Sequence, residues 1–246
     1  MTDRIKKTFS RLVLILGLAP AMAGCAAMGP TDNPLLRSLS RDRYVGGDDI
    51  ARACTPGQPA RYRLVYNAIE DQQTRSYDIA AFPEGGAMLE AQVIGPPVLN
   101  DPRRGISVAD PIRPWRGESA LYRLNPAEFQ RVVDALQAAG FERPAPQGLH
   151  LRGDSFFWTA SACRDGKFHF HAWGYPSPEF DRMAEPLLDV MLAFDKTGVA
   201  VQRPYAVALP PYSSYFNITD PEVVNRAPRR YIVGKNGLEY SQGTIN

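Results

Sequence analysis

The sequence predicts an α+β domain in which two helices pack on an antiparallel β-sheet. Short runs of aromatic and β-branched residues, separated by turn residues, are typical of antiparallel strands. Two longer segments carry apolar residues at helical spacing. An Asp-Gly pair between two aromatic runs marks a tight hairpin. The expected order along the chain is therefore strands, helix, strands, helix, with mostly hairpin connections.

Four strands are expected before the first helix. The second and third flank Pro83-Glu84-Gly85-Gly86, whose turn residues predict a hairpin. Residues 95–114 are expected to form a loop, because their five prolines cannot donate to a strand ladder. The four strands are predicted at about residues 61–67, 75–82, 88–94 and 119–124.

The first helix has a clear start and end. Asn125 is a good N-cap, Pro126 suits the first helical position, and Glu128 can return a bond to the cap residue. Gly140 ends the helix. One face then carries the apolar residues Phe129, Val132, Val133 and Leu136, and this face should cover one side of the sheet.

The hairpin around Asp165-Gly166 is the best-defined feature of the second half. A two-residue turn of this type fixes the register of its strands, 156–163 and 168–173. Opposed residues share a face of the sheet. The expected pairs are Cys163 with Phe168, Ala162 with His169, Ala160 with His171, and Trp158 with Trp173.

The second helix is predicted from Ser177 to about Gly198, with Pro186 inside it. The apolar stripe stays in phase across Pro186, so we expect a kink and not two separate helices. This stripe consists of Phe180, Met183, Leu187, Val190, Met191 and Phe194.

The first 24 residues have the pattern of an export signal. Four basic residues precede the apolar run 12–19, and small residues follow it up to Cys25. The apolar run is shorter than the roughly 20 residues that a membrane-spanning helix needs. We therefore expect residues 1–24 to be a cleaved signal peptide.

The end of this signal, Met22-Ala23-Gly24-Cys25, resembles the lipobox of bacterial lipoproteins, although Met22 replaces the usual leucine. The resemblance implies cleavage after Gly24, diacylglycerol on the Cys25 thiol and a further acyl chain such as palmitate on the new amino terminus. Ala26, where inner-membrane lipoproteins tend to carry aspartate, implies an outer-membrane anchor facing the periplasm, with the inner membrane as the alternative. An ordinary secretory signal beside a chance cysteine is the competing interpretation. The remaining chain resembles uncharacterised proteobacterial envelope lipoproteins with one small disulfide-bridged domain.

Loss of the signal changes the charge of the chain. Residues 1–24 hold four Lys or Arg and one Asp, so cleavage takes the formal net charge from +2 to −1. Such a balance offers no basic surface for nucleic acid, which is not expected as a partner. The expected partners are the membrane, through the lipid on Cys25, and an envelope protein.

The predicted division of the mature chain has three parts. Residues 25–53 form a lipidated tether, 54–203 the α+β domain, and 204–246 an extended or disordered C-terminal arm, so both extensions are expected to be flexible. With Cys25 assigned to lipid, Cys54 and Cys163 remain as a pair. In an oxidising compartment such a pair most simply forms a disulfide, and a reactive thiol is the alternative.

The candidate site lies on the Asp165-Gly166 hairpin. His169 and His171 point to one face, where two imidazoles could bind a metal, although further ligands would be needed and the remaining histidine is His150. The same face carries Trp158 and Trp173 and could line a ligand groove. Simple packing under a helix is favoured over both. No cofactor is predicted.

The functional expectation is a non-enzymatic lipoprotein that binds or scaffolds another envelope component. The sequence has no Gly-x-Ser-x-Gly, His-Glu-x-x-His or glycine-rich phosphate motif. The alternative is a periplasmic metal-binding protein or enzyme that uses His169 and His171.

Overall fold

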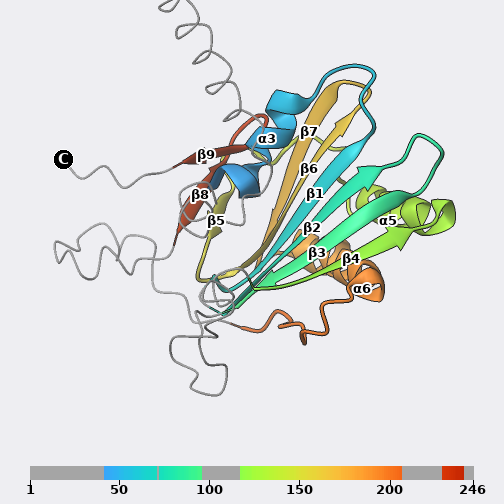
Figure 1. Cartoon of the computed structure of the whole chain (residues 1–246). Coiled ribbons are helices and arrows are strands. Elements are labelled where there is room, and N and C mark those ends of the chain that lie inside the picture. Colours follow the sequence, from blue (N-terminus) through green and yellow to red (C-terminus); the bar gives the residue numbers. More distant parts are fainter. Residues whose placement is uncertain (1–41, 71, 96–116, 207–228, 241–246) are drawn as a thin grey trace, which may run out of the picture.

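A computed structural model describes residues 42–70, 72–95, 117–206 and 229–240 (Figure 1). Its main element is a six-stranded sheet in which every neighbouring pair of strands is antiparallel. The strand order is β4-β3-β2-β1-β6-β7, which places β1 and β6 side by side. The strands are β1 (Arg61–Ala68), β2 (Gln73–Ala81), β3 (Ala87–Ile94), β4 (Glu118–Leu124), β6 (Phe156–Arg164) and β7 (Lys167–Gly174).

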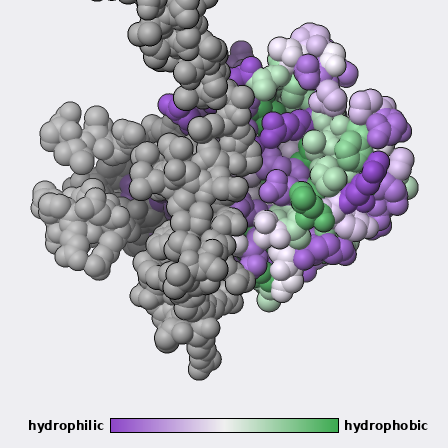
Figure 2. Space-filling model, in the orientation of Figure 1, coloured by the Kyte–Doolittle hydropathy of each residue, from purple (hydrophilic) through white to green (hydrophobic). Residues whose placement is uncertain are grey.

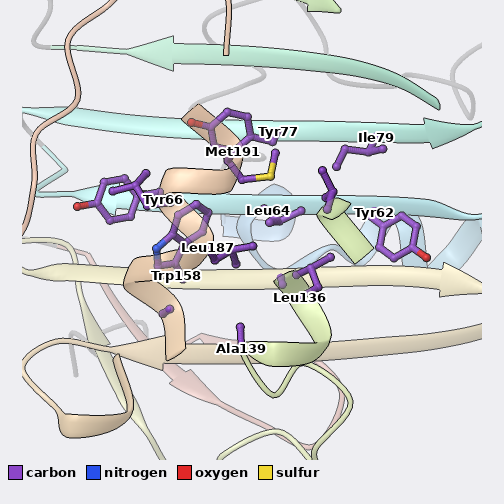
Figure 3. Packing of buried hydrophobic residues seen from close by; sticks show 14 of the residues in the cluster. Tyr62, Leu64, Tyr66, Tyr77, Ile79, Leu136, Ala139, Trp158, Leu187 and Met191 are labelled. Carbon is purple, nitrogen blue, oxygen red and sulfur yellow. The ribbon is translucent and has the colours of Figure 1, made fainter. Parts of the chain in front are cut away.

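Two helices cover one face of this sheet, as predicted. Helix α5 (Pro126–Ala138) begins with the expected capping box, in which the Asn125 side chain accepts from the Glu128 amide and the Glu128 carboxylate accepts from the Asn125 amide. Helix α6 (Glu185–Phe194) packs beside it. Their apolar faces meet a layer of strand side chains that includes Leu64, Tyr77 and Trp158 (Figure 3). This layer is the main hydrophobic core.

Pro186 disturbs the second helix without dividing it. The turn before it, η4 (Phe180–Ala184), is a π-helix that leads directly into α6. Proline has no N–H and clashes with the carbonyl one turn earlier, and the wider π-turn relieves that clash. Phe180 and Leu187, on either side of the proline, are both buried in the core.

The opposite face of the sheet, here called the far face, is partly covered by two small elements. Helix α3 (Asp48–Ala53) lies against β6, and a three-stranded sheet of β5 (His150–Arg152), β8 (Arg230–Val233) and β9 (Leu238–Tyr240) lies beside it (Figure 1). A second apolar cluster joins them to the main sheet. It contains Val45, Val65, Leu151, Phe157, Phe170, Tyr231 and Val233.

Residues 42–53 were predicted as part of the tether, but they belong to the domain. Residues 42–46 are helical, α3 follows, and Val45 and Ile50 are buried. Gly47 adopts the left-handed conformation at the junction, and a Cβ there would lie 2.4 Å from the Ser161 hydroxyl. Gly47 thus permits a close approach of this segment to the sheet. Residues 25–41 lie outside the described residues.

The predicted C-terminal arm also contains ordered structure. Strands β8 and β9 pair with each other, and β8 pairs with β5 from the middle of the chain. These strands have four and three residues, too few for a periodic signal to distinguish them from a loop. Residues 207–228 and 241–246 of the arm lie outside the described residues.

The predicted disulfide between Cys54 and Cys163 is confirmed. It joins the end of α3 to the end of β6, with a Cα–Cα distance of 5.5 Å. Hydrophilic and hydrophobic residues are intermixed over the coloured part of the surface in Figure 2. Within the described ranges, no helix is long and apolar enough to cross a membrane.

Candidate functional site

The four residues of the predicted site share one face of the β6–β7 hairpin. The predicted register is confirmed, because Trp158 pairs with Trp173, Ala160 with His171, and Ala162 with His169. This face is the one covered by the helices, and Trp158 and Trp173 belong to the main core. The expectation that the two imidazoles point to the same side is therefore correct.

The segment that follows α5 lies over these side chains. Trp173 donates from Nε1 to the Ala139 carbonyl at 3.0 Å, His169 bonds through Nε2 to the Phe141 carbonyl, and His171 bonds through Nδ1 to the Arg143 carbonyl at 3.2 Å. We call these three side chains and three carbonyls the β7 clamp. A helix end leaves carbonyls without partners in the helix, and the β7 clamp supplies donors at and beyond that end.

Most of the side chains on this face of the hairpin are buried. Trp158, Trp173 and His171 are 0, 1 and 3% exposed, so these side chains are packed in the interior. The His169 ring stands edge-on to the Phe141 ring, with centroids 4.8 Å apart. The His171 ring lies 4.7 Å from the Trp173 ring. The packing interpretation accounts for all of these contacts.

The tautomers of both imidazoles follow from their partners. A carbonyl oxygen accepts only, so Nε2 of His169 and Nδ1 of His171 each carry a proton. Nε2 of His171 then has a free lone pair, and it is buried without a hydrogen-bond partner among the described residues. Burial lowers the pKa of His171, while the Arg143 carbonyl and Glu179 oppose this shift.

The described residues do not complete a metal site around these imidazoles. They contain no group of three or more His, Cys, Asp or Glu side chains that could hold a metal ion. His150, the remaining histidine, is exposed on β5. Cys25, the predicted lipidation site, lies outside the described residues.

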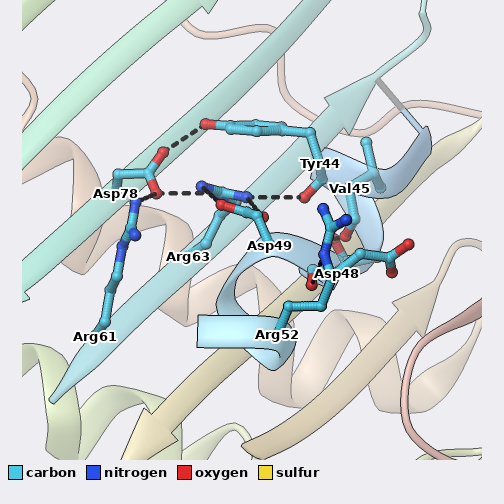
Figure 4. A network of polar contacts seen from close by, with 9 residues as sticks. Tyr44, Val45, Asp48, Asp49, Arg52, Arg61, Arg63 and Asp78 are labelled. Atoms are coloured by element: carbon cyan, nitrogen blue, oxygen red, sulfur yellow. Dashed lines mark hydrogen bonds and ion pairs between the residues drawn. The ribbon is translucent and has the colours of Figure 1, made fainter. Parts of the chain in front are cut away.

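A buried charged cluster on the far face was not found from the sequence. Arg63 of β1 is 1% exposed and donates to Asp78 through Nε at 2.9 Å and to Asp49 through Nη1 at 2.6 Å (Figure 4). The Tyr44 ring lies over the guanidinium, with its centroid 3.7 Å from Arg63 Cζ, and its hydroxyl donates to Asp78 at 2.5 Å. We call these four residues, with Arg61 beside Asp78 at 3.8 Å, the Arg63 network.

Opposite charges within the Arg63 network favour the ionised forms of Arg63 and Asp49. Burial alone would lower the pKa of Arg63, but Asp78, Tyr44 and Asp49 raise it well above its usual range. Burial likewise opposes ionisation of Asp49, yet the bond from Arg63 lowers the pKa of that carboxyl. The Arg63 network fastens residues 44–49 to β1 and β2.

A second buried arginine lies on the helix face. Arg75 of β2 is fully buried and pairs through Nη1 with Asp195 at 2.6 Å. It also donates to the Gln73 side chain and to the Val199 carbonyl, while Tyr77 donates to Asp195 at 3.0 Å. We call these five residues the Arg75 network. It fastens the chain that leaves α6 to the sheet.

Alternating polarity could have indicated that Arg63 faces inward, but not which acids meet it. Asp49 and Asp195 lie 14 and 120 residues from the arginines that they bind.

Comparisons with known proteins add no assignment, since no protein-family model, curated protein or solved structure matches the chain.

Proposed function

We propose that this chain is an envelope lipoprotein, held to the outer membrane by lipid on Cys25, that binds or scaffolds another envelope component. The lipobox resemblance of Met22-Ala23-Gly24-Cys25 is the observation that carries the anchoring part. Two or three acyl chains, at about 0.8 kcal/mol per buried methylene, would hold the domain permanently at the membrane surface.

The use of polar groups inside the domain supports a binding role over a catalytic one. The two imidazoles of the β7 clamp donate to backbone carbonyls, and both buried arginines are engaged by carboxylates. Groups that perform chemistry on a substrate must be able to reach it. These two imidazoles and two guanidinium groups instead hold segments of the domain together.

The β4 edge of the sheet is the surface that we assign to the partner. Among the described residues β4 pairs with β3 alone, and its Leu121 is 67% exposed, the most exposed large apolar side chain in that part of the chain. An edge strand can accept an extended segment through main-chain hydrogen bonds, with side-chain contacts giving specificity. The proposed partner is an envelope protein that adds such a segment beside β4.

The anchor is tested by fractionating membranes from cells fed labelled palmitate. Cys25→Ala should lose both the label and the membrane association, because the acylated thiol is gone. Ala26→Asp should keep the label and move to the inner membrane fraction. Membrane retention of a labelled Cys25→Ala protein would overturn the lipid anchor.

The binding surface is tested by cross-linking in intact cells followed by purification of the full-length lipoprotein. We expect a discrete adduct that Leu121→Arg abolishes, since a charged side chain would disturb an apolar contact at the edge. Ala127→Arg, at an exposed position of α5, should keep the adduct. Equal yields from both variants would exclude the β4 edge, and turnover of an envelope substrate by the purified domain alone would exclude the non-enzymatic role.

A further inference from the structure

The β7 clamp contains one indole donor and two imidazole donors. Trp173 donates to Ala139 at every pH, whereas His169 and His171 bind the carbonyls of Phe141 and Arg143. The two imidazoles therefore hold the part of the segment that lies beyond the end of α5. Within this segment the Phe141 amide donates to Leu136 and the Arg143 amide to Gly140, both at 3.0 Å.

His171 is the member of the β7 clamp that acid affects most directly. Its Nδ1 proton is committed to the Arg143 carbonyl, so an added proton must go to Nε2. That atom is buried and meets no acceptor within the described part of the chain. A buried donor without a partner costs roughly 1–3 kcal/mol, and a charged one costs more. The cost is avoided if Nε2 reaches water.

Among the described residues, the groups around His171 provide no unpaired acceptor for the imidazolium. Arg143 faces it from the segment above and repels the added charge, as does His169 from the same strand. Glu179, at the start of the second helix, attracts it but is paired with Arg143 at 2.7 Å. Ala160, opposite on β6, is apolar. An acceptor for the Nε2 proton would therefore have to come from water.

We propose that the β7 clamp is an acid-sensitive latch, in which protonation of His171 at Nε2 releases residues 141–143 from β7. The proton comes from solvent, and no covalent bond changes. Release opens the edge of the hydrophobic core that this segment covers, because Phe141 is itself a buried member of that core. The device belongs to the domain alone and does not depend on the anchor or on the β4 surface.

The direction of the pH effect follows from the pKa of His171. Burial holds this pKa below the ordinary value of 6.5, so the unfolded or opened state binds the proton more readily. The stability contributed by neutral His171 is therefore complete above pH 6.5 and is lost as pH falls through the lowered pKa. The closed latch is the neutral-pH state.

Hydrogen exchange of the intact protein at about pH 7.5 and about pH 5, corrected for intrinsic exchange rates, tests the latch. The Phe141 and Arg143 amides should exchange severalfold faster at the lower pH, while the Trp173 indole and the central β1 amides stay protected. His171→Asn keeps a donor at the position of Nδ1 and cannot titrate, so its exchange should not change with pH. His169→Gln keeps a donor at the position of Nε2 and should respond like the wild type.

Unchanged protection in the wild-type protein, or an acid response that persists in His171→Asn, would overturn the proposal. If His171→Asn does not fold, an NMR titration of the imidazole carbons in the wild-type protein can still test the proposal. The His171 midpoint must then coincide with the midpoint of the Phe141 and Arg143 amide shifts. Separate midpoints would show that another group drives the opening.

Discussion

The two faces of the main sheet hold their neighbouring segments by different means. On the helix face, α5 and α6 present continuous apolar stripes to a large core, and the Arg75 network secures only the chain that leaves α6. On the far face, residues 42–53 bury few apolar side chains and are held by the Arg63 network and the disulfide. Segments with a periodic apolar face are fixed by burial, and segments without one need specific polar or covalent bonds.

The two buried arginines also differ in their access to water. Asp195, the partner of Arg75, is 3% exposed, whereas Asp78 and Asp49 beside Arg63 are 14 and 29% exposed. An ion pair inside the core costs more free energy to desolvate, and removing one of its partners lowers the stability of the fold more. We therefore expect the helix-face pair to be the more sensitive of the two.

Asp195→Ala should cause the largest loss of stability. It leaves the fully buried Arg75 guanidinium without its carboxylate, which costs about 3–5 kcal/mol in the free energy of unfolding. Urea unfolding followed by tryptophan fluorescence measures this loss. The double variant Arg75→Met with Asp195→Leu removes both charges and should recover most of it; no recovery would mean that the hydrogen bonds, and not the orphaned charge, dominate.

Removal of the disulfide should have the next largest effect. Cys54→Ala with Cys163→Ala frees a loop with a sequence separation of 109 residues, and the expected loss is about 2–5 kcal/mol. Thermal unfolding with and without reductant measures it in the wild type. The variant itself should not respond to reductant, and a response would indicate that some other bond is being reduced.

Arg63→Met should have a smaller and more local effect. Hydrogen bonds to charged groups contribute about 1.5–3 kcal/mol, and the partly exposed Asp49 and Asp78 can regain water when the guanidinium is lost. Limited proteolysis should then cut near residues 42–49 before it cuts the sheet. Arg61→Met, at a side chain 37% exposed, is the matched control and should change stability by less than about 1 kcal/mol.

Local signals predicted most of the helix face. The capping residues Asn125 and Glu128, the apolar stripe of α5 and the Asp165-Gly166 turn each act over a few neighbours, so the sequence around them was sufficient. The cysteine pair was predictable because few pairings are available to two thiols. The common face of His169 and His171 followed from the period of a strand.

The far face depends on contacts between distant segments, which a single sequence does not display. Gly46 and Gly47 resemble a linker, and only the position of Ser161 reveals that Gly47 is needed for close packing. Strand β8 is recognisable only beside β5, about 80 residues earlier in the chain. The carbonyl partners of the two imidazoles were likewise hidden, because backbone atoms carry no residue-specific signal.

The position of the disulfide has a mechanical consequence. A pulling force applied between the two ends of the chain passes from Cys54 through the sulfur atoms to Cys163, because this covalent route is the shortest one. Residues 55–162, which include β1 to β4 and α5, lie inside the loop that the disulfide closes, so a pull on the chain ends cannot extend them while the bond is intact. Tension between the ends of the chain would thus extend the segments outside this loop and leave the centre of the sheet folded until the disulfide breaks.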